Sequence, residues 1–423
     1  MNKVKLKELA NIELSNVDKK INDKELLVTL CNFVDVYKNW AITNNISKTF
    51  MKATATKNEI KKFTLKKGYI AITKDSETRD DIGISTYIAD NLKNTILGYH
   101  CALIKLKNNE LNGKYLNAVL HSQMARKYFA NNASGSGQRY TLTVNSIENF
   151  PIPLINLDKQ KKIGNLLSNI DKKIELNNKI NDELEAMAKT IYDYWFLQFE
   201  FSNEKGKPYK SSGGKMVWNE ELKREIPEGW EVVTLEDFGT LGNGINYDKK
   251  ISGDKEYKIV NVKNISDSTL LLDKEKLDRI YLPSELADKY RINKNDILIA
   301  RSGIPGAIRV LKIDTIENII YCGFIICLRL DDELYKNYLV YKLKDYENTK
   351  ATTSGGTVMQ NVNQQTLRQI KFPVPNEATI KIFNKKIDII WNCIQKNINE
   401  NQELTSLRDF LLPLLMNGQV GFK

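Results

Sequence analysis

The chain has few of the residues from which catalytic and metal sites are usually built. Its 423 residues include two histidines, His100 and His121, and no Walker A phosphate loop. The Pro-Pro dipeptide of adenine methyltransferase motifs is absent. A nuclease pattern of Asp plus Glu-x-Lys can be placed on Asp237, Glu256 and Lys258, but such triplets arise by chance in a chain this rich in Lys and Glu. The sequence therefore predicts a protein that is not an enzyme and has no catalytic, cofactor-binding or metal-ligating residues of its own.

Paired cysteines and long apolar runs are missing too. The five cysteines are odd in number and form no C-x-x-C pair, which argues against a disulfide framework or a zinc ribbon. No run approaches the roughly 18 apolar residues of a membrane span, and the start "MNKVKLKELANIEL" lacks the pattern of a signal peptide. We expect a cytoplasmic protein, with His100 in the core as part of "GYHCALI" and His121 on a helix without ligand partners.

What the chain does have is positive charge, unevenly distributed. The net charge is +11, and residues 1–157 hold 23 basic and 14 acidic side chains, a net +9. Residues 230–375 hold 21 basic and 20 acidic side chains and are nearly neutral. An excess in one module indicates a polyanionic partner, nucleic acid before a membrane surface, because no basic amphipathic helix stands out. A well-solvated surface without a partner is the alternative.

A second feature is an internal repeat. "FPIP" at Phe150 and "FPVP" at Phe372 each follow a Ser-Gly loop and precede a long heptad pattern. Pro153 and Pro373 are 220 residues apart, and the same offset matches, without a gap, Ser134 with Ser354, Gly135 with Gly355, Asn156 with Asn376, Lys161 with Lys381, Ile170 with Ile390, Ile174 with Ile394, Asn177 with Asn397, Asn181 with Asn401, Glu183 with Glu403 and Leu184 with Leu404. Upstream, "KKGYIAITK", "CALIKL" and "YLNAVL" resemble "KNDILIAR", "IICLRL" and "YLVYKL". Two copies indicate a duplication rather than a solenoid.

Each copy ends in a predicted coiled-coil seam, by which we mean residues at alternating steps of four and three. The seams are Ile163, Leu167, Ile170, Ile174, Asn177, Asn181, Leu184, Ala188, Ile191 and Trp195, and Phe383, Ile387, Ile390, Ile394, Asn397, Asn401, Leu404, Arg408, Leu411 and Leu415. The two Asn of each seam straddle its midpoint, so antiparallel packing would face Asn177 with Asn401 and Asn181 with Asn397. A buried Asn penalises misaligned pairing, which predicts a register lock. Exposed Asn on a frayed helix is the alternative.

The remaining sequence predicts an α+β fold, because short β-type runs such as "GYIAIT" and "DILIAR" alternate with helical stretches. We expect two duplicated modules separated by two long antiparallel coiled-coil helices. The predicted boundaries are 1–157 for the first module, 158–200 for the first helix, 201–229 for a surface linker, 230–375 for the second module and 376–423 for the second helix.

Polar loops recur at equivalent places of the two modules. "ASGSGQRYTLT" and "TTSGGTVMQNV" combine glycines, which let backbone N–H groups approach phosphates, with side chains that read base edges. "ITKDSETRDD" and "ARSGIPGAIR" form a second such pair. These loops predict a DNA-contacting set of Lys74, Arg79, Ser134, Gly135, Ser136, Gln138, Arg139, Tyr140, Arg301, Ser302, Arg309, Ser354, Gly355, Thr357, Gln360 and Asn361.

Over nearly its whole length the chain resembles the specificity subunit of type I restriction-modification enzymes. The resemblance is carried by "FPIP" and "FPVP" before the heptad helices, by the connector "YWFLQFEFSNEKGKPYKSSGGKMVWNEELKREIPEGWEVVTLEDF" and by the ending "LRDFLLPLLMNGQV". It implies two target-recognition domains that each bind one half of a split double-stranded DNA site. It also implies two methylation subunits that bring S-adenosylmethionine, and restriction subunits that use ATP and Mg. The second module is nearly neutral, whereas the first is strongly basic, so it stays open whether the two modules bind phosphate equally.

Physical dimensions then suggest a mechanism. A helix of about 33 residues is roughly 50 Å long, enough to hold two modules about one turn of DNA apart. Spacer length would be a property of the helices, and half-site sequence a property of the modules. Three alternatives stay open: a related methylation-only or fused system, a coiled-coil adaptor that never reads DNA, and a stand-alone modification or nuclease enzyme, against which the missing motifs argue.

Overall fold

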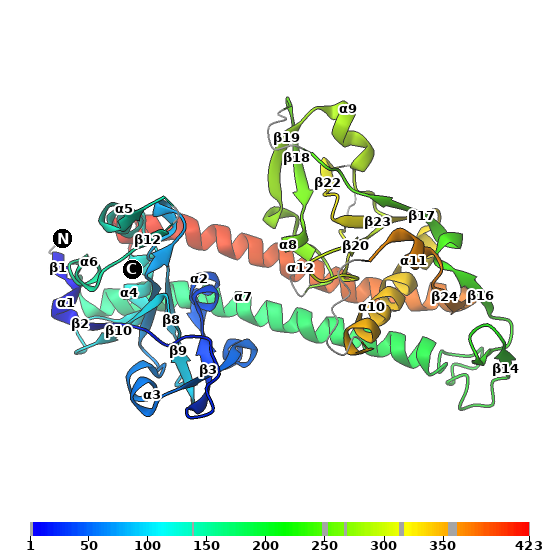
Figure 1. The fold of residues 1–423 in the computed structure, drawn as a ribbon, viewed down its shortest axis with the longest axis horizontal. Helices are drawn as coiled ribbons and strands as arrows, with labels where there is room; N and C mark the ends of the chain where they lie inside the picture. Colours follow the sequence, from blue (N-terminus) through cyan, green and yellow to red (C-terminus); the bar gives the residue numbers. More distant parts are fainter. Residues whose placement is uncertain are drawn as a thin grey trace. The chain divides into compact units, whose positions relative to one another are not determined.

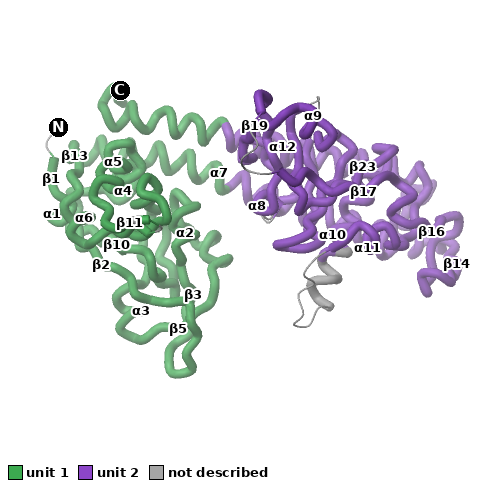
Figure 2. The backbone as a smooth tube through the Cα atoms, turned by 45° about the horizontal axis from the view of Figure 1, so that its top comes forward, with its two compact units in different colours: residues 1–175, 403–423 green, residues 176–402 purple. Residues whose placement is uncertain are grey.

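The computed structural model describes residues 3–137, 139–247, 253–265, 269–312, 317–353 and 362–422. The chain divides into two compact units, coloured separately in Figure 2: unit 1 comprises Met1–Glu175 and Glu403–Lys423, and unit 2 comprises Leu176–Gln402. The helices α7 (Leu157–Tyr192) and α12 (Glu377–Met416) each contribute residues to both units. No helix in the described ranges is long and apolar enough to cross a membrane.

Unit 1 is built on a five-stranded sheet in the order β2-β10-β6-β8-β4 and a three-stranded sheet in the order β5-β3-β9. Its elements before α7 are β1 (Lys3–Lys5), α1 (Leu6–Leu9), β2 (Ala10–Leu14), β3 (Leu26–Cys31), α2 (Phe33–Lys38), β4 (Ala41–Ile42), η1 (Ile46–Thr49), β5 (Met51–Ala55), α3 (Lys57–Phe63), β6 (Ile70–Thr73), β7 (Asp75–Ser76), η2 (Arg79–Asp81), β8 (Ser85–Ile88), β9 (Thr95–Leu97), β10 (Cys101–Leu106), α4 (Gly113–Leu120), α5 (Gln123–Asn132), β11 (Ser134–Ser136), β12 (Arg139–Thr141), α6 (Val144–Glu148) and β13 (Pro151–Pro153).

Unit 2 has a four-stranded sheet in the order β17-β23-β20-β21 and a three-stranded sheet in the order β19-β18-β22. Between the long helices lie a π-helical turn (Asp193–Leu197), β14 (Met216–Asn219), β15 (Arg224–Pro227), β16 (Glu231–Thr234), η4 (Leu235–Phe238), β17 (Gly239–Asn243), β18 (Lys255–Val260), α8 (Val262–Ile265), η5 (Lys274–Lys276), β19 (Asp278–Leu282), α9 (Ser284–Ala287), η6 (Asp288–Tyr290), β20 (Asp296–Ala300), β21 (Ile308–Arg309), β22 (Ile319–Tyr321), β23 (Ile325–Leu330), η7 (Glu333–Tyr335), α10 (Lys336–Thr353), α11 (Gln364–Arg368) and β24 (Lys371–Val374).

The two units repeat one topology. The antiparallel neighbours β2, β10 and β6 correspond to β17, β23 and β20, and the parallel pair β3 and β9 corresponds to β18 and β22. Both copies bury their central strands on two faces, because successive side chains of a strand point to opposite sides. Ala102 and Ile104 of β10 enter one core of unit 1, and Cys101 and Leu103 enter the other. The predicted α+β duplication is confirmed.

The duplicated proline segments form short strands. β13 pairs with β1 and β24 pairs with β16, each in a two-stranded sheet. A proline without an N–H can occupy such a small sheet, and each segment lies where a module ends and a long helix begins, with β13 before α7 and β24 before α12. A buried tyrosine repeats the arrangement: Tyr115 donates a 2.6 Å hydrogen bond to the carbonyl of Pro153, and Tyr338 donates a 2.5 Å bond to that of Pro373.

The long helices pack antiparallel, as the seams predict (Figure 1). Within unit 1, Ile163 and Leu167 of α7 share a core with Leu412 and Leu415 of α12. The seam residue Trp195 lies in the π-helical turn rather than in the α-helix. Pro413 is accommodated inside the last turns of α12. Apolar burial along the seams is what stabilises two helices of this length.

The stretch 201–229, predicted as a surface linker, is mostly exposed or half-buried but has secondary structure of its own. It contains the hairpin of β14 and β15, and Phe201 and Ile226 lie in the core of unit 2. Phe201 stacks between Tyr209 and Trp230, with ring centroids 4.6 and 5.3 Å apart. The prediction was based on the Gly, Ser and Lys content of the stretch and gave no weight to its few aromatic and aliphatic residues, which contribute to this core.

Candidate nucleic-acid interface

In unit 1 the strand pairing gathers the polar loops at one end of the five-stranded sheet. Cys101 pairs with Thr73, so the next residues beyond the sheet, Lys74 and His100, are neighbours. The N–H of Lys74 donates to the carbonyl of His100 at 2.9 Å, and the N–H of Leu142 donates to the carbonyl of Lys74 at 2.7 Å. β12 then pairs with both β7 and β11, which brings the Ser-Gly loop against the loop that follows β6.

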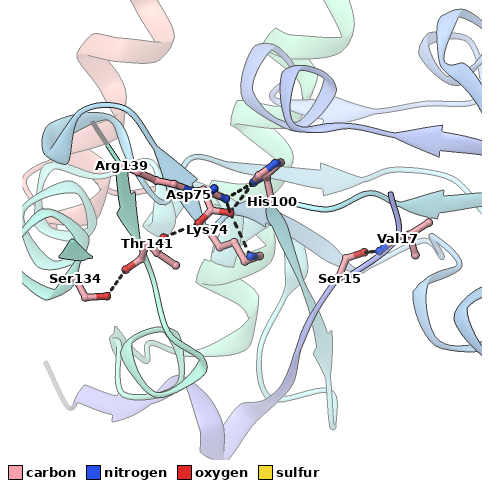
Figure 3. A network of polar contacts seen from close by, with 8 residues as sticks. All are labelled: Ser15, Val17, Lys74, Asp75, His100, Ser134, Arg139 and Thr141. Atoms are coloured by element: carbon pink, nitrogen blue, oxygen red, sulfur yellow. Dashed lines mark hydrogen bonds and ion pairs between the residues drawn. The ribbon is translucent and has the colours of Figure 1, made fainter. Parts of the chain in front are cut away.

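These contacts assemble what we call the Asp75 cluster, consisting of Asp75, Lys74, His100, Arg139 and Thr141 (Figure 3). The Oδ2 atom of Asp75 lies 2.7 Å from His100 Nδ1 and 3.2 Å from Lys74 Nζ. It also lies 3.4 Å from Arg139 Nη2, while Oδ1 accepts a 2.7 Å hydrogen bond from Thr141 Oγ1. One carboxylate thus contacts four donors from three segments of the chain.

The Asp75 carboxyl group is 8% exposed and stays ionised. Burial by itself would raise its pKa, but hydrogen bonds from Thr141, His100 and Lys74 outweigh burial and lower the pKa to about 2. The cluster holds three basic groups around this one charge. It therefore presents a fixed, donor-rich surface rather than an acidic one.

Arg139 and His100 are the accessible members of the cluster, with side chains 57% and 36% exposed. They line a pocket of about 490 Å³ together with Phe33, Tyr37, Asp75, Ser76, Glu77, Thr78 and Asp81. Gly135 fixes the hairpin behind Arg139: its φ is +121°, and a Cβ atom would lie 2.2 Å from the Arg139 carbonyl oxygen. Only glycine fits there without moving the backbone.

The other predicted residues of unit 1 have mixed positions. Lys74 is buried over the ring of Tyr99 at 4.6 Å, so it supports the cluster rather than offering an exposed cation, which corrects its prediction as a DNA contact. The guanidinium of Arg79 lies 5.2 Å from the ring centre of Tyr140. The hydroxyl of Ser134 donates to the carbonyl of Thr141 inside the hairpin. Ser136 lies in β11 and its side chain is outside the described part of the structure, as is all of Gln138.

Unit 2 repeats the backbone frame with different side chains. The N–H of Arg301 donates to the carbonyl of Phe324 at 2.9 Å, and the N–H of Val362 donates to the carbonyl of Arg301 at 3.2 Å. Arg301 and Phe324 therefore occupy the positions of Lys74 and His100. Phe324 is 61% exposed and borders a pocket of about 520 Å³ that Asn246, Tyr247, Asn261, Lys263 and Asp278 also line.

Arg301 and Ser302 lie, partly exposed, in the turn after β20. Arg309 was expected to contact DNA but is 3% exposed in β21, with Nη1 donating to the carbonyl of Ile308. A buried guanidinium cannot meet phosphate in this conformation, which corrects that prediction. The predicted contacts Ser354, Gly355, Thr357, Gln360 and Asn361 lie outside the described residues.

The helix asparagines meet as the symmetry of the seams predicts. Asn177 Nδ2 donates to Asn401 Oδ1 at 2.9 Å, and Asn397 Nδ2 donates to Asn181 Oδ1 at 2.8 Å. Asn177 and Asn181 are buried, and Asn177 also donates to Glu400 at 2.7 Å. These hydrogen bonds join the two helices at the layers that the seams predict, although Asn177 Oδ1 is buried without a hydrogen-bond partner.

Sequence reasoning missed Asp75, Thr141 and His100 as site residues. The first two stand inside loops that the sequence singled out, but acidic and small polar residues there carry no signal of their own. His100 was assigned to the core, which was wrong: it has φ +72° and turns its ring toward Asp75. His121 caps the end of α4, is half-buried and stacks on Trp40 at 4.3 Å, and desolvation lowers its pKa to about 4.

Comparison with known proteins identifies a family for the chain. The family described as "Type I restriction modification DNA specificity domain" matches residues 1–186 and again residues 227–406. The HindI specificity subunit of Haemophilus influenzae is 24% identical over 414 residues, covering 85% of this chain and 88% of that protein. The MjaIX specificity subunit of Methanocaldococcus jannaschii is 25% identical over 315 residues, covering 73% and 69%. A crystal structure of the S subunit from M. genitalium aligns over 98% of this chain and 95% of that one, with a TM-score of 0.48 and 15% identity. The chain therefore belongs to the family of type I restriction-modification specificity subunits.

Proposed function

We propose that the chain is the DNA-reading subunit of its complex, in which each unit binds one half of a bipartite double-stranded site. The observation that carries this is the repeated frame at the end of the two sheets. Two backbone hydrogen bonds are kept in both units, while the side chains that they present differ. A kept frame with exchanged side chains suits two modules that read different bases, because the backbone positions the loop and the side chains specify.

Phosphate binding would supply most of the affinity and base contacts the selectivity. Unit 1 brings most of the positive charge, with a net +9 over residues 1–157. We therefore expect the half-site bound by unit 1 to contribute more of the salt-dependent DNA affinity than the half-site bound by unit 2. Glycine-supported loops beside the exposed Arg139 and the partly exposed Arg301 are the surfaces that would enter the major groove.

The paired asparagines support a role for the long helices as a ruler. We propose that the antiparallel alignment sets the number of bases between the half-sites. A shift of one helix would leave buried amides unpaired, at a cost of about 1–3 kcal/mol each. The alignment is thereby held against alternatives that apolar residues alone would tolerate.

Catalysis would come from partner subunits. The described residues contain no group of three or more His, Cys, Asp or Glu that could hold a metal ion. We propose that two methylation subunits bring S-adenosylmethionine, and that restriction subunits bring ATP- and Mg-dependent cleavage. Exposed apolar side chains on α7 (Leu176, Ile180 and Met187), followed by Tyr194 in the π-helical turn, support docking of such subunits on the helices, since exposed apolar surface marks interaction sites.

The test is a footprint of the full chain assembled with its copurifying methylation subunits, combined with methylation mapping in cells that carry the system. We expect protection and methylation of one sequence split by a fixed spacer. Protection of no specific sequence would leave a structural coiled-coil adaptor. Methylation without cleavage, and without a translocating partner in the purified complex, would favour a methylation-only system.

A further inference from the structure

We propose that Arg139, held by Asp75, reads a guanine in the half-site of unit 1. This rests on the proposed function and names a base-reading residue and its base. The planar arginine fork can donate two hydrogen bonds to O6 and N7 of guanine, the commonest specific contact between a protein and a base. The described contacts of Arg139, with Asp75 and His100, both use Nη2. Nη2 carries two hydrogens, so it can keep its contact with the cluster through one of them and use the other, together with Nη1, as the fork that donates to a base.

The Asp75 carboxylate restricts the conformations of the Arg139 side chain, and this suits Arg139 to recognising one base. A side chain that is already held loses less conformational entropy on binding, which favours one geometry over many. Asp75 is itself fixed by Thr141 and His100, and Gly135 fixes the hairpin that carries Arg139. The arginine is therefore anchored at both its tip and its backbone.

Unit 2 shows that the fold does not require this arrangement. The same pair of backbone hydrogen bonds forms there with Phe324 and Ser302 at the positions of His100 and Asp75. The charged cluster is present in unit 1 and absent at the described positions of unit 2, so the sheet does not need it in order to form. We therefore assign the cluster to the recognition of a half-site by unit 1.

The surroundings of Arg139 favour a base edge over a phosphate. Besides the paired Asp75, the carboxylates of Glu77 and Asp81 line the same pocket, and a phosphate placed there would be repelled by them. A guanine edge carries only partial charge. The amino group of the paired cytosine is a donor that a carboxylate accepts, so the pocket suits the whole base pair.

The experiment uses the full chain assembled with its methylation subunits and the bipartite sequence found by methylation mapping. Each G·C pair is replaced in turn by A·T, and a second set of duplexes carries 7-deazaguanine, which lacks N7. At one position of one half-site we expect a 5- to 150-fold (order-of-magnitude) loss of affinity for wild type, with part of that loss from 7-deazaguanine. Arg139→Ala should lose this discrimination, and Arg126→Ala, another exposed arginine of unit 1, should keep it.

The outcomes separate the two proposals. Discrimination that persists at every position in Arg139→Ala overturns the inference, as does an equal loss of affinity on all duplexes, which would make Arg139 a phosphate contact. Absence of any bipartite sequence for wild type would instead remove the proposed function. Asp75→Asn should weaken the same position only. Because that change leaves the buried Lys74 unpaired and can destabilise unit 1, Arg139→Ala, altering an exposed side chain, carries the decision.

Discussion

Replacing the helix asparagines tests whether they act as pairs. Asn181 is 3% exposed and accepts the 2.8 Å hydrogen bond of Asn397. In Asn181→Leu the amide of Asn397 stays in the seam without its partner, which costs about 1–3 kcal/mol and offsets what the buried leucine contributes. The same holds for Asn397→Leu. In the double variant no amide is left, and two leucines pack in the seam.

We therefore expect the double variant to be more stable than the sum of the single changes by about 2 kcal/mol, within the range of coupled neighbours. Equilibrium urea unfolding, followed by the fluorescence of the unit 2 core residues Trp195 and Trp391, measures each free energy. Asn399→Leu, on the exposed face of α12, is the matched control and should change stability by less than about 0.5 kcal/mol. Additive effects of the two leucines would refute the pairing argument.

Three further predictions concern DNA and pH. Deleting four residues of α7 should change the preferred spacer or abolish assembly, and mapping that finds altered half-site bases with an unchanged spacer would contradict the ruler. Arg301→Ala and Arg79→Ala should weaken DNA binding at fixed salt without disturbing subunit association; for Arg79 we expect a uniform loss and a salt slope lower by about 1. Burial raises the pKa of Asp171 from 3.8 to about 7, partly opposed by Arg408, so its ionisation destabilises unit 1 as pH rises from about 4 to 7. Asp171→Asn should therefore raise the melting temperature at pH 8 and have little effect at pH 4; an equal effect at both would contradict it.

The parts of the fold that the sequence could predict are those with a period. Apolar runs matching between "CALIKL" and "IICLRL" predicted the central strands, and the positions of Asn177 and Asn397 in the heptads predicted how the helices meet. Both depend on local spacing, which the sequence displays directly.

The candidate site was less accessible to sequence reasoning because it depends on contacts between distant residues. Asp75 meets Arg139 across 64 positions, and nothing near either residue announces the other. Arg309 was misplaced for the opposite reason: its loop looked polar, but strand pairing turned the side chain into the interior. Composition was therefore enough to identify the polar loops. The structure was needed to show which of their side chains are exposed and which are buried supports.

The central claim is that each unit reads its own half-site. The most direct measurement is genome-wide methylation mapping of cells in which residues 230–375 are replaced by the corresponding module of a relative. The account predicts a new sequence in one half-site, with the other half-site and the spacer unchanged. A change in both half-sites, or methylation without a split motif, would contradict it.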